Sequence, residues 1–161
     1  MKPLMITFAL LFAFGPATAN ACAMKRVRIK AKPVLLVKMV KDAQKAEKKG
    51  HARNAIRQYE RAMNARGDIK LKAKAAYSAA KLHLAAGNAE RAQSRLEKAV
   101  TFDSRHAMAH AVLAKLLAER GEIDTARVHL KKAQANGAEI DAVVAAEKAI
   151  LFATSTAFLG L

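Results

Sequence analysis

The chain has few of the residues that interrupt helices or favour sheets. It holds 3 prolines among 161 residues, none of them after Pro33, together with no tryptophan and an aromatic content of 5%. Proline is the strongest local breaker of a helix and alanine the best helix former, so nothing after Pro33 prevents long helical stretches. Hydrophobic residues, many of them alanine, make up 53% of the chain. The sequence therefore predicts a single all-α domain.

Residues that carry chemistry are also scarce. Cys22 is the only cysteine, which excludes a disulfide within the chain. The sequence contains no glycine-rich phosphate loop and no nucleophile elbow. His106 and His110 have the i, i+4 spacing of a helical metal site, but Ala107 stands where zinc proteases carry glutamate and no third ligand is evident. We therefore expect no enzymatic activity, no cofactor and no metal, and interpret the two histidines as a helix-start residue and a packed residue.

Residues 1–22 have the layout of a secretory signal peptide. Lys2 is followed by an apolar run over residues 4–14, then Gly15-Pro16 and small residues. A helix of this run would cover about half of a hydrocarbon core about 30 Å thick, so a permanent membrane span is not expected. The segment Ala19–Cys22 partly resembles the box of a bacterial lipoprotein signal, which leaves plain cleavage and lipidation at Cys22 both open. We expect an exported protein, either periplasmic or attached to the cell envelope.

The net charge of +16 is concentrated in the first half of the chain. Residues 25–74 hold 17 Lys or Arg against 4 Asp or Glu, whereas residues 75–161 hold 11 against 9. Residues 23–33 form the start of this basic half, and we interpret them as an exposed basic arm. Such an excess would raise the local concentration of anionic partners, although it could equally be a solvated surface that keeps an alanine-rich protein soluble.

From Pro33 onward the sequence repeats itself. Gly50, Gly87 and Gly121 are each followed five residues later by alanine, and they are spaced by 37 and then 34 residues. Each glycine ends one alanine-rich helical pattern and begins the next. Glycine accepts the left-handed conformation that closes a helix, so each is expected to turn the chain into a helical hairpin.

This pattern resembles the tetratricopeptide repeat family, which has a period of 34 residues and small residues at fixed places. The resemblance implies a short right-handed solenoid of about three repeats, over residues 34–69, 70–106 and 107–140, followed by a capping helix and tail over residues 141–161. Nine small residues match the packing positions of the family: Ala43, Ala55, Ala62, Ala80, Ala92, Ala99, Ala114, Ala126 and Ala133. The family's large aromatic residue and proline are absent from their usual places. We expect the capping helix to cover the apolar end of the stack with Val143, Val144, Ile150, Leu151 and Phe152.

The resemblance also implies a concave groove that binds a protein or peptide. Its expected lining residues are Gln44, Lys48, Lys74, Tyr77, Lys81, Met108 and Lys115. A groove of this composition suits an acidic or amphipathic segment. We therefore predict an exported scaffold or adaptor of the bacterial envelope. The alternative is a peripheral protein whose basic half binds anionic membrane or polymer. Export and the scarcity of aromatic residues argue against nucleic acid.

Overall fold

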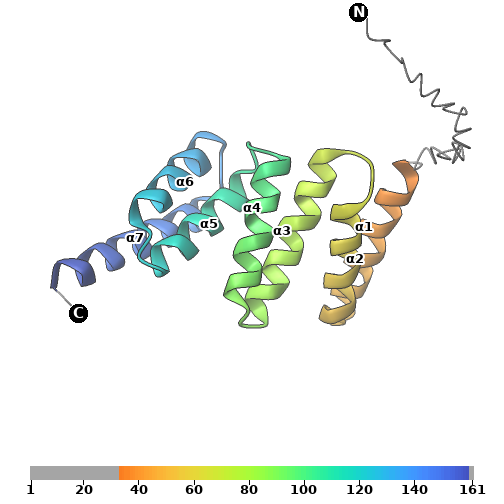
Figure 1. Cartoon of the computed structure of the whole chain (residues 1–161), viewed down its shortest axis with the longest axis horizontal. Coiled ribbons are helices and arrows are strands. Elements are labelled where there is room, and N and C mark those ends of the chain that lie inside the picture. The colour runs from red at the N-terminus through yellow and green to blue at the C-terminus, as the bar shows by residue number, and fades with distance from the viewer. Residues whose placement is uncertain (1–32, 160–161) are drawn as a thin grey trace, which may run out of the picture.

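The computed structural model describes residues 33–159, and this range contains seven α-helices and no strand (Figure 1). In chain order they are α1 (Pro33–Lys48), α2 (Ala52–Asn64), α3 (Ile69–Ala85), α4 (Ala89–Phe102), α5 (Ala107–Glu119), α6 (Ile123–Ala135) and α7 (Ile140–Leu159). The first six form hairpin pairs that follow one another along the long axis of the molecule, and α7 comes after the last pair (Figure 1). The predicted all-α solenoid is confirmed.

Each pair turns at one of the three glycines identified in the sequence. Gly50, Gly87 and Gly121 have φ angles of 75°, 75° and 80°. At the second turn the amide of Asn88 donates to the carbonyl of His83 at 2.9 Å, and equivalent bonds close α1 and α5. A Cβ atom at Gly87 would meet nothing within 4 Å. The left-handed backbone, rather than a lack of space, therefore requires glycine at this turn.

The loop between α2 and α3 serves a different purpose. Gly67 lies against α1, where an added Cβ atom would come within 2.6 Å of Cδ2 of Leu36. The next residue, Asp68, caps α3, because its carboxylate accepts a hydrogen bond from the amide of Lys70 at 2.9 Å. This loop contains the extra residues that make the first glycine spacing longer than the second, and it holds the first pair close to α3.

Small side chains set the spacing within the stack. The nine alanines at the recurring positions are all fully buried: Ala43, Ala55, Ala62, Ala80, Ala92, Ala99, Ala114, Ala126 and Ala133. Alanine at these contacts lets neighbouring helix backbones approach closely. Larger residues fill the remaining core, among them Leu96, Leu113 and Tyr59. The Tyr59 hydroxyl donates to Oε2 of Glu47 at 2.7 Å, which joins α2 to α1; burial, followed by this carboxylate, raises the pKa of Tyr59.

The last helix covers the stack with one face only. α7 packs against α5 and α6, with Ala146 and Ile150 buried. Leu151 and Phe152 are instead 69% and 72% exposed. The expectation that five apolar residues of this segment would cover the end is therefore wrong for these two, and also for Val144, which is exposed. A single helix can bury only one stripe against its neighbours, and these residues lie outside that stripe.

The two ends of the stack differ at equivalent positions of the repeat. The stripe of α7 that packs on the preceding pair consists of Val143, Ala146 and Ile150. In α1, which has no preceding pair within the described residues, the equivalent positions hold Lys38, Lys41 and Lys45, all exposed. We call these the N-end lysines. They give the first helix a charged outer surface, the usual property of a terminal repeat.

Several expectations concern residues outside the described range of 33–159. These are the signal peptide over residues 1–22, lipidation at Cys22, and almost all of the basic arm over residues 23–33. Within the described range, no helix combines the length and apolar character needed to cross a membrane.

Candidate protein-binding surface

The residues expected to line a groove all come from the first helix of a hairpin pair. They are Gln44 and Lys48 on α1, Lys74, Tyr77 and Lys81 on α3, and Met108 and Lys115 on α5. Tyr77 and Met108 are half-buried, and the other five are exposed. We call these seven residues the first-helix face. A ligand in solution can reach all of them, because no other part of the described chain covers them completely.

An aromatic and cationic cluster lies at the centre of the first-helix face. The Tyr77 and His106 rings have centroids 5.1 Å apart, and Nζ of Lys81 lies 5.6 Å from the centre of the Tyr77 ring. Burial raises the pKa of Tyr77, and the negative charge of Glu139 raises it further. Burial lowers the pKa of His106, and the positive charge of Lys74 also acts to lower it. The cluster therefore combines a neutral phenol, usable as a hydrogen-bond donor, with two exposed ammonium groups.

His106 has a structural role as well. Its Nδ1 atom accepts a hydrogen bond from the amide of Ala109 at 3.2 Å, so the side chain caps the start of α5. An accepting Nδ1 requires the neutral ring with its proton on Nε2. Burial lowers the pKa of His106 and so favours this neutral form. Sequence reasoning placed His106 at a helix start but did not place it beside Tyr77, which precedes it by 29 residues.

The remaining members of the first-helix face are spread along the stack. Among the described residues, no hydrogen bond or ring contact joins Gln44, Lys48 or Met108 to the Tyr77 cluster. Lys115 lies farther along, on α5, where Nζ is 3.7 Å from Oε1 of Glu119. Such an array can contact an extended segment at several points and does not converge on one small molecule.

A cavity of about 770 Å³ lies between the end of α5, the start of α6 and the second half of α7. Lys115, Arg120 and Lys148 bring positive charge to its lining, and Ile123 and Phe152 bring apolar surface. Only Lys115 of this group was predicted as a lining residue. Sequence reasoning placed Phe152 in a covering role and therefore missed the cavity, which exists because α7 leaves that side chain unburied.

His110 does not pair with His106, although the two share the metal-like spacing. Its Nδ1 atom lies 2.8 Å from Nδ1 of His129 on α6, and its Nε2 atom lies 3.0 Å from the carbonyl oxygen of Ser104. The carbonyl can only accept, so Nε2 of His110 donates to it and the Nδ1 proton belongs to His129. Burial lowers the pKa of both His110 and His129. The pair is a partly buried polar contact within the third hairpin, and nothing in the helical spacing of His110 indicated His129.

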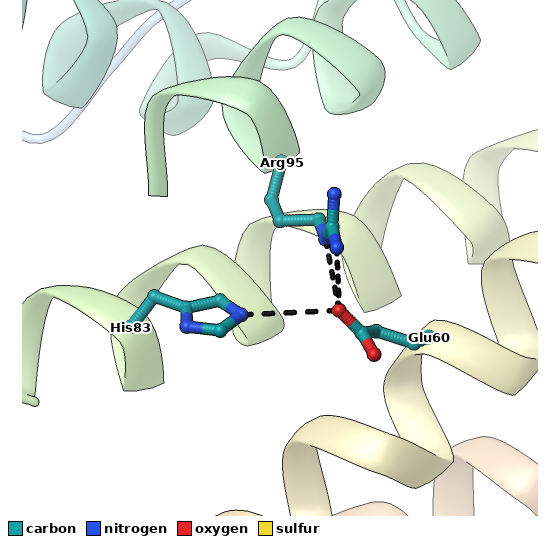
Figure 2. A network of polar contacts seen from close by, with 3 residues as sticks. All are labelled: Glu60, His83 and Arg95. Carbon is teal, nitrogen blue, oxygen red and sulfur yellow. Dashed lines mark hydrogen bonds and ion pairs between the residues drawn. The ribbon is translucent and has the colours of Figure 1, made fainter. Parts of the chain in front are cut away.

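A second polar network joins the first two pairs of helices (Figure 2). Nε and Nη2 of Arg95 on α4 donate to Oε1 of Glu60 on α2, at 3.1 and 2.6 Å. Nε2 of His83 on α3 lies 3.9 Å from the same oxygen, and neither ring nitrogen has a hydrogen-bond partner. Burial lowers the pKa of His83, and the charge of Arg95 lowers it further. The network fixes one pair against the next and is a structural contact, since His83 is buried.

The arrangements on the first-helix face offer groups that can bind a peptide. Among the described residues, no group of three or more His, Cys, Asp or Glu side chains could hold a metal ion. The first-helix face instead presents ammonium groups, a phenol and apolar surface over three successive helices. Such groups can bind carboxylates and apolar side chains of a peptide.

Comparison with protein families identifies the repeat. The profile described as "Tetratricopeptide repeat" matches residues 83–150. This match begins near the end of α3 and ends within α7, so it includes two of the three glycine turns. No curated protein matches the sequence significantly.

Solved structures share the fold. The crystal structure of the P58(IPK) TPR domain matches with a TM-score of 0.66 and 22% sequence identity. The match covers 77% of this chain but 34% of the other, so this chain spans about a third of the length of its structural relative. Identity at this level supports the shared fold, and the partners of that protein carry no information about this one.

Proposed function

Because this chain is a tetratricopeptide repeat protein, we propose that it is an adaptor that binds a segment of a protein partner along a basic concave groove. The observation that carries this proposal is the cluster of Tyr77, Lys81 and His106 at the centre of the first-helix face. Ammonium groups beside an aromatic ring favour a segment that alternates acidic and apolar side chains. Lys115 and the cavity beside it would extend the contact toward α7.

The same proposal places the adaptor in the bacterial cell envelope. Its support is the order of features in residues 1–22: a basic start, an apolar run, a breaker and small residues. A mass spectrum of the protein recovered from the envelope would identify its first residue and any lipid on Cys22. A mature chain that still begins at Met1 would contradict export through a cleaved signal.

Charge reversal tests the groove directly. The purified chain, immobilised and exposed to an envelope extract of its source cells, should retain a defined protein identified by mass spectrometry. The double variant Lys74→Glu, Lys81→Glu should weaken that capture by about tenfold or more, because two attractive contacts become repulsive. The matched variant Arg127→Glu, Lys131→Glu makes the same change of charge at exposed residues of α6. It should retain the partner.

The groove proposal fails if both double variants retain the partner equally well. Equal loss in both would also contradict it, because the effect would then follow net charge and not position. Circular dichroism of both variants should match that of the unchanged protein, since all four side chains are exposed.

A second candidate function is binding to an anionic membrane surface. The observation that favours it is the exposure of the N-end lysines, which continue the basic character of residues 23–33. Vesicles containing phosphatidylglycerol should then bind the full chain, and binding should fall steeply between low and physiological salt. Binding that is insensitive both to salt and to deletion of residues 24–32 would eliminate this function.

A further inference from the structure

Among the described helices, α7 carries more exposed large hydrophobic residues than any other. Leu151 is 69% exposed, Phe152 72% and Phe158 89%, and Val144 on the same helix is also exposed. Val144, Leu151 and Phe158 are spaced by seven residues, and this repeat keeps them on one stripe of a helix. We call these four side chains the α7 stripe. An exposed stripe of this size indicates an interaction surface.

The repeat itself shows that this face is normally covered. Leu151 occupies the position that Ala46, His83 and Leu117 hold in α1, α3 and α5. Those three residues are buried, with exposed fractions of 7%, 5% and 4%, and each lies in a first helix that is followed by a second helix of its own pair. Among the described residues, α7 has no second helix, and it continues as a helix through Ser155, where the preceding first helices have turned at glycine. Its last turns therefore extend beyond the paired stack (Figure 1).

We propose that the α7 stripe is the interface of a symmetric dimer, in which the α7 helices of two copies of this chain pack antiparallel about Leu151. Three observations favour a second copy as the occupant: the charge distribution of α7, the chemistry of the opposite end of the stack, and the area available.

The charge distribution of α7 is compatible with its own copy. Residues 149–161 contain no charged residue. In an antiparallel pair centred on Leu151, Phe158 of one copy lies opposite Val144 of the other, and Glu147 and Lys148 lie opposite uncharged residues near Ser155. No like charges face one another, although the chain as a whole carries a net charge of +16. The opposed dipoles of antiparallel helices add a small favourable term.

The N-end lysines of α1 argue against head-to-tail stacking, the other simple way to join two copies. Head-to-tail stacking would press α1 of one copy against α7 of the next. That contact would bury the N-end lysines, whose charged groups have no partners on the uncharged second half of α7. A two-fold arrangement uses the same surface twice and leaves the lysines in water.

The area is sufficient for a small specific interface. Phenylalanine buries about 150–250 Å² when fully covered, so the α7 stripe offers about 500 Å² in each copy. The pair would remove about 1,000 Å² from water, which is near the lower limit for a stable association.

Sedimentation equilibrium of the full chain tests the proposal. The unchanged protein should be a dimer in the micromolar range, and the variant Leu151→Lys, Phe152→Lys should raise the dissociation constant by about a hundredfold or more, since a two-fold interface contains each substitution twice. The matched variant Leu35→Lys, Val37→Lys adds the same charge to exposed apolar residues of α1. It should remain dimeric.

Cross-linking tests the geometry. In a chain with Cys22 replaced by serine, Leu151→Cys should form a disulfide between copies under mild oxidation, whereas Thr125→Cys, at an exposed residue of α6, should not. A mixture of one chain carrying Val144→Cys and another carrying Phe158→Cys should cross-link between the two, as antiparallel packing requires.

Two results would overturn the proposal. One is a chain that stays monomeric at about 100 micromolar, well above a dissociation constant in the micromolar range. That result would assign the α7 stripe to another protein or to a membrane. The other is a dimer that persists with unchanged affinity in the Leu151→Lys, Phe152→Lys variant. Neither result bears on the charge-reversal test of the groove, because Lys74 and Lys81 lie on α3 and not on α7.

Discussion

The two end helices of the described solenoid, α1 and α7, expose side chains of opposite character. A stack of helical pairs presents an unpaired surface wherever it stops. At the start, the N-end lysines occupy positions that are apolar or small in the later first helices, so α1 faces water with charge. At the other end, α7 buries Ile150 against the stack and leaves Leu151 and Phe152 exposed. Within residues 33–159, the first end therefore meets water with charged side chains and the second with apolar ones, and the proposed dimer would cover the apolar ones.

The largest expected effect is a difference in the free energy of unfolding between substitutions at two adjacent residues of α7, Ile150 and Leu151. Ile150→Lys should destabilise the protein by about 2–5 kcal/mol, because a buried side chain that joins α7 to the stack is replaced by a charge. Leu151→Lys should change the free energy of unfolding by no more than about 0.5 kcal/mol. Urea unfolding followed by circular dichroism measures both, at a protein concentration where the chain is monomeric. Equal effects at the two positions would contradict the one-sided packing of α7.

An intermediate effect is expected when the first end is made to resemble the last. The triple variant Lys38→Val, Lys41→Ala, Lys45→Ile installs at the N-end positions the residues found in α7. The variant should gain a new apolar surface on α1, and its self-association constant should rise by about tenfold or more. Sedimentation velocity should show species larger than those of the unchanged chain.

The control for that variant removes three exposed cations elsewhere. Lys98→Val, Arg127→Ala and Lys131→Ile alter the second helices of the last two pairs by the same number of charges. If both triple variants associate equally, the lower net charge is the cause and the N-end lysines have no special role.

The smallest expected effect is a loss of stability at low pH, and it should arise in the third helical pair, which lies between α1 and α7. Burial lowers the pKa of His110 and His129 below the ordinary value of 6.5. The unfolded chain therefore binds protons more readily than the folded one, so stability is intact above about pH 6.5 and falls as the pH drops below it. Lys132 beside the pair acts in the same direction.

Melting curves from pH 8 to pH 5 test this expectation. His129→Asn keeps a side-chain donor but removes one titrating ring, and it should reduce the acid sensitivity of the melting temperature. A variant that folds at pH 8 and shows the same acid dependence as the unchanged chain would contradict a role for the pair. Neither α1 nor α7 contains histidine, so acid should loosen the paired stack before either end.

Local patterns were enough to predict most of the fold. The recurring glycines fix where the chain turns, because few other residues tolerate a φ near 75°. Alanines such as Ala92 and Ala126 recur one repeat apart, and they indicate which stripe of each helix meets its neighbour. These are properties of short segments, and they repeat with the period of the sequence.

Contacts between distant residues could not be predicted in this way. The Glu60–Arg95 bond and the His110–His129 contact join helices whose side chains must first be placed in three dimensions. The same is true of Tyr77 and His106, which only the packing of α3, α4 and α5 brings together.

The amino-acid sequence by itself determined the helices, their turns and the small residues between them, because backbone propensity and side-chain size act locally. Only the tertiary structure decided which apolar residues of α7 are covered. Burial depends on how many neighbours a helix has, and among the described helices α7 packs only against α5 and α6, on one of its sides.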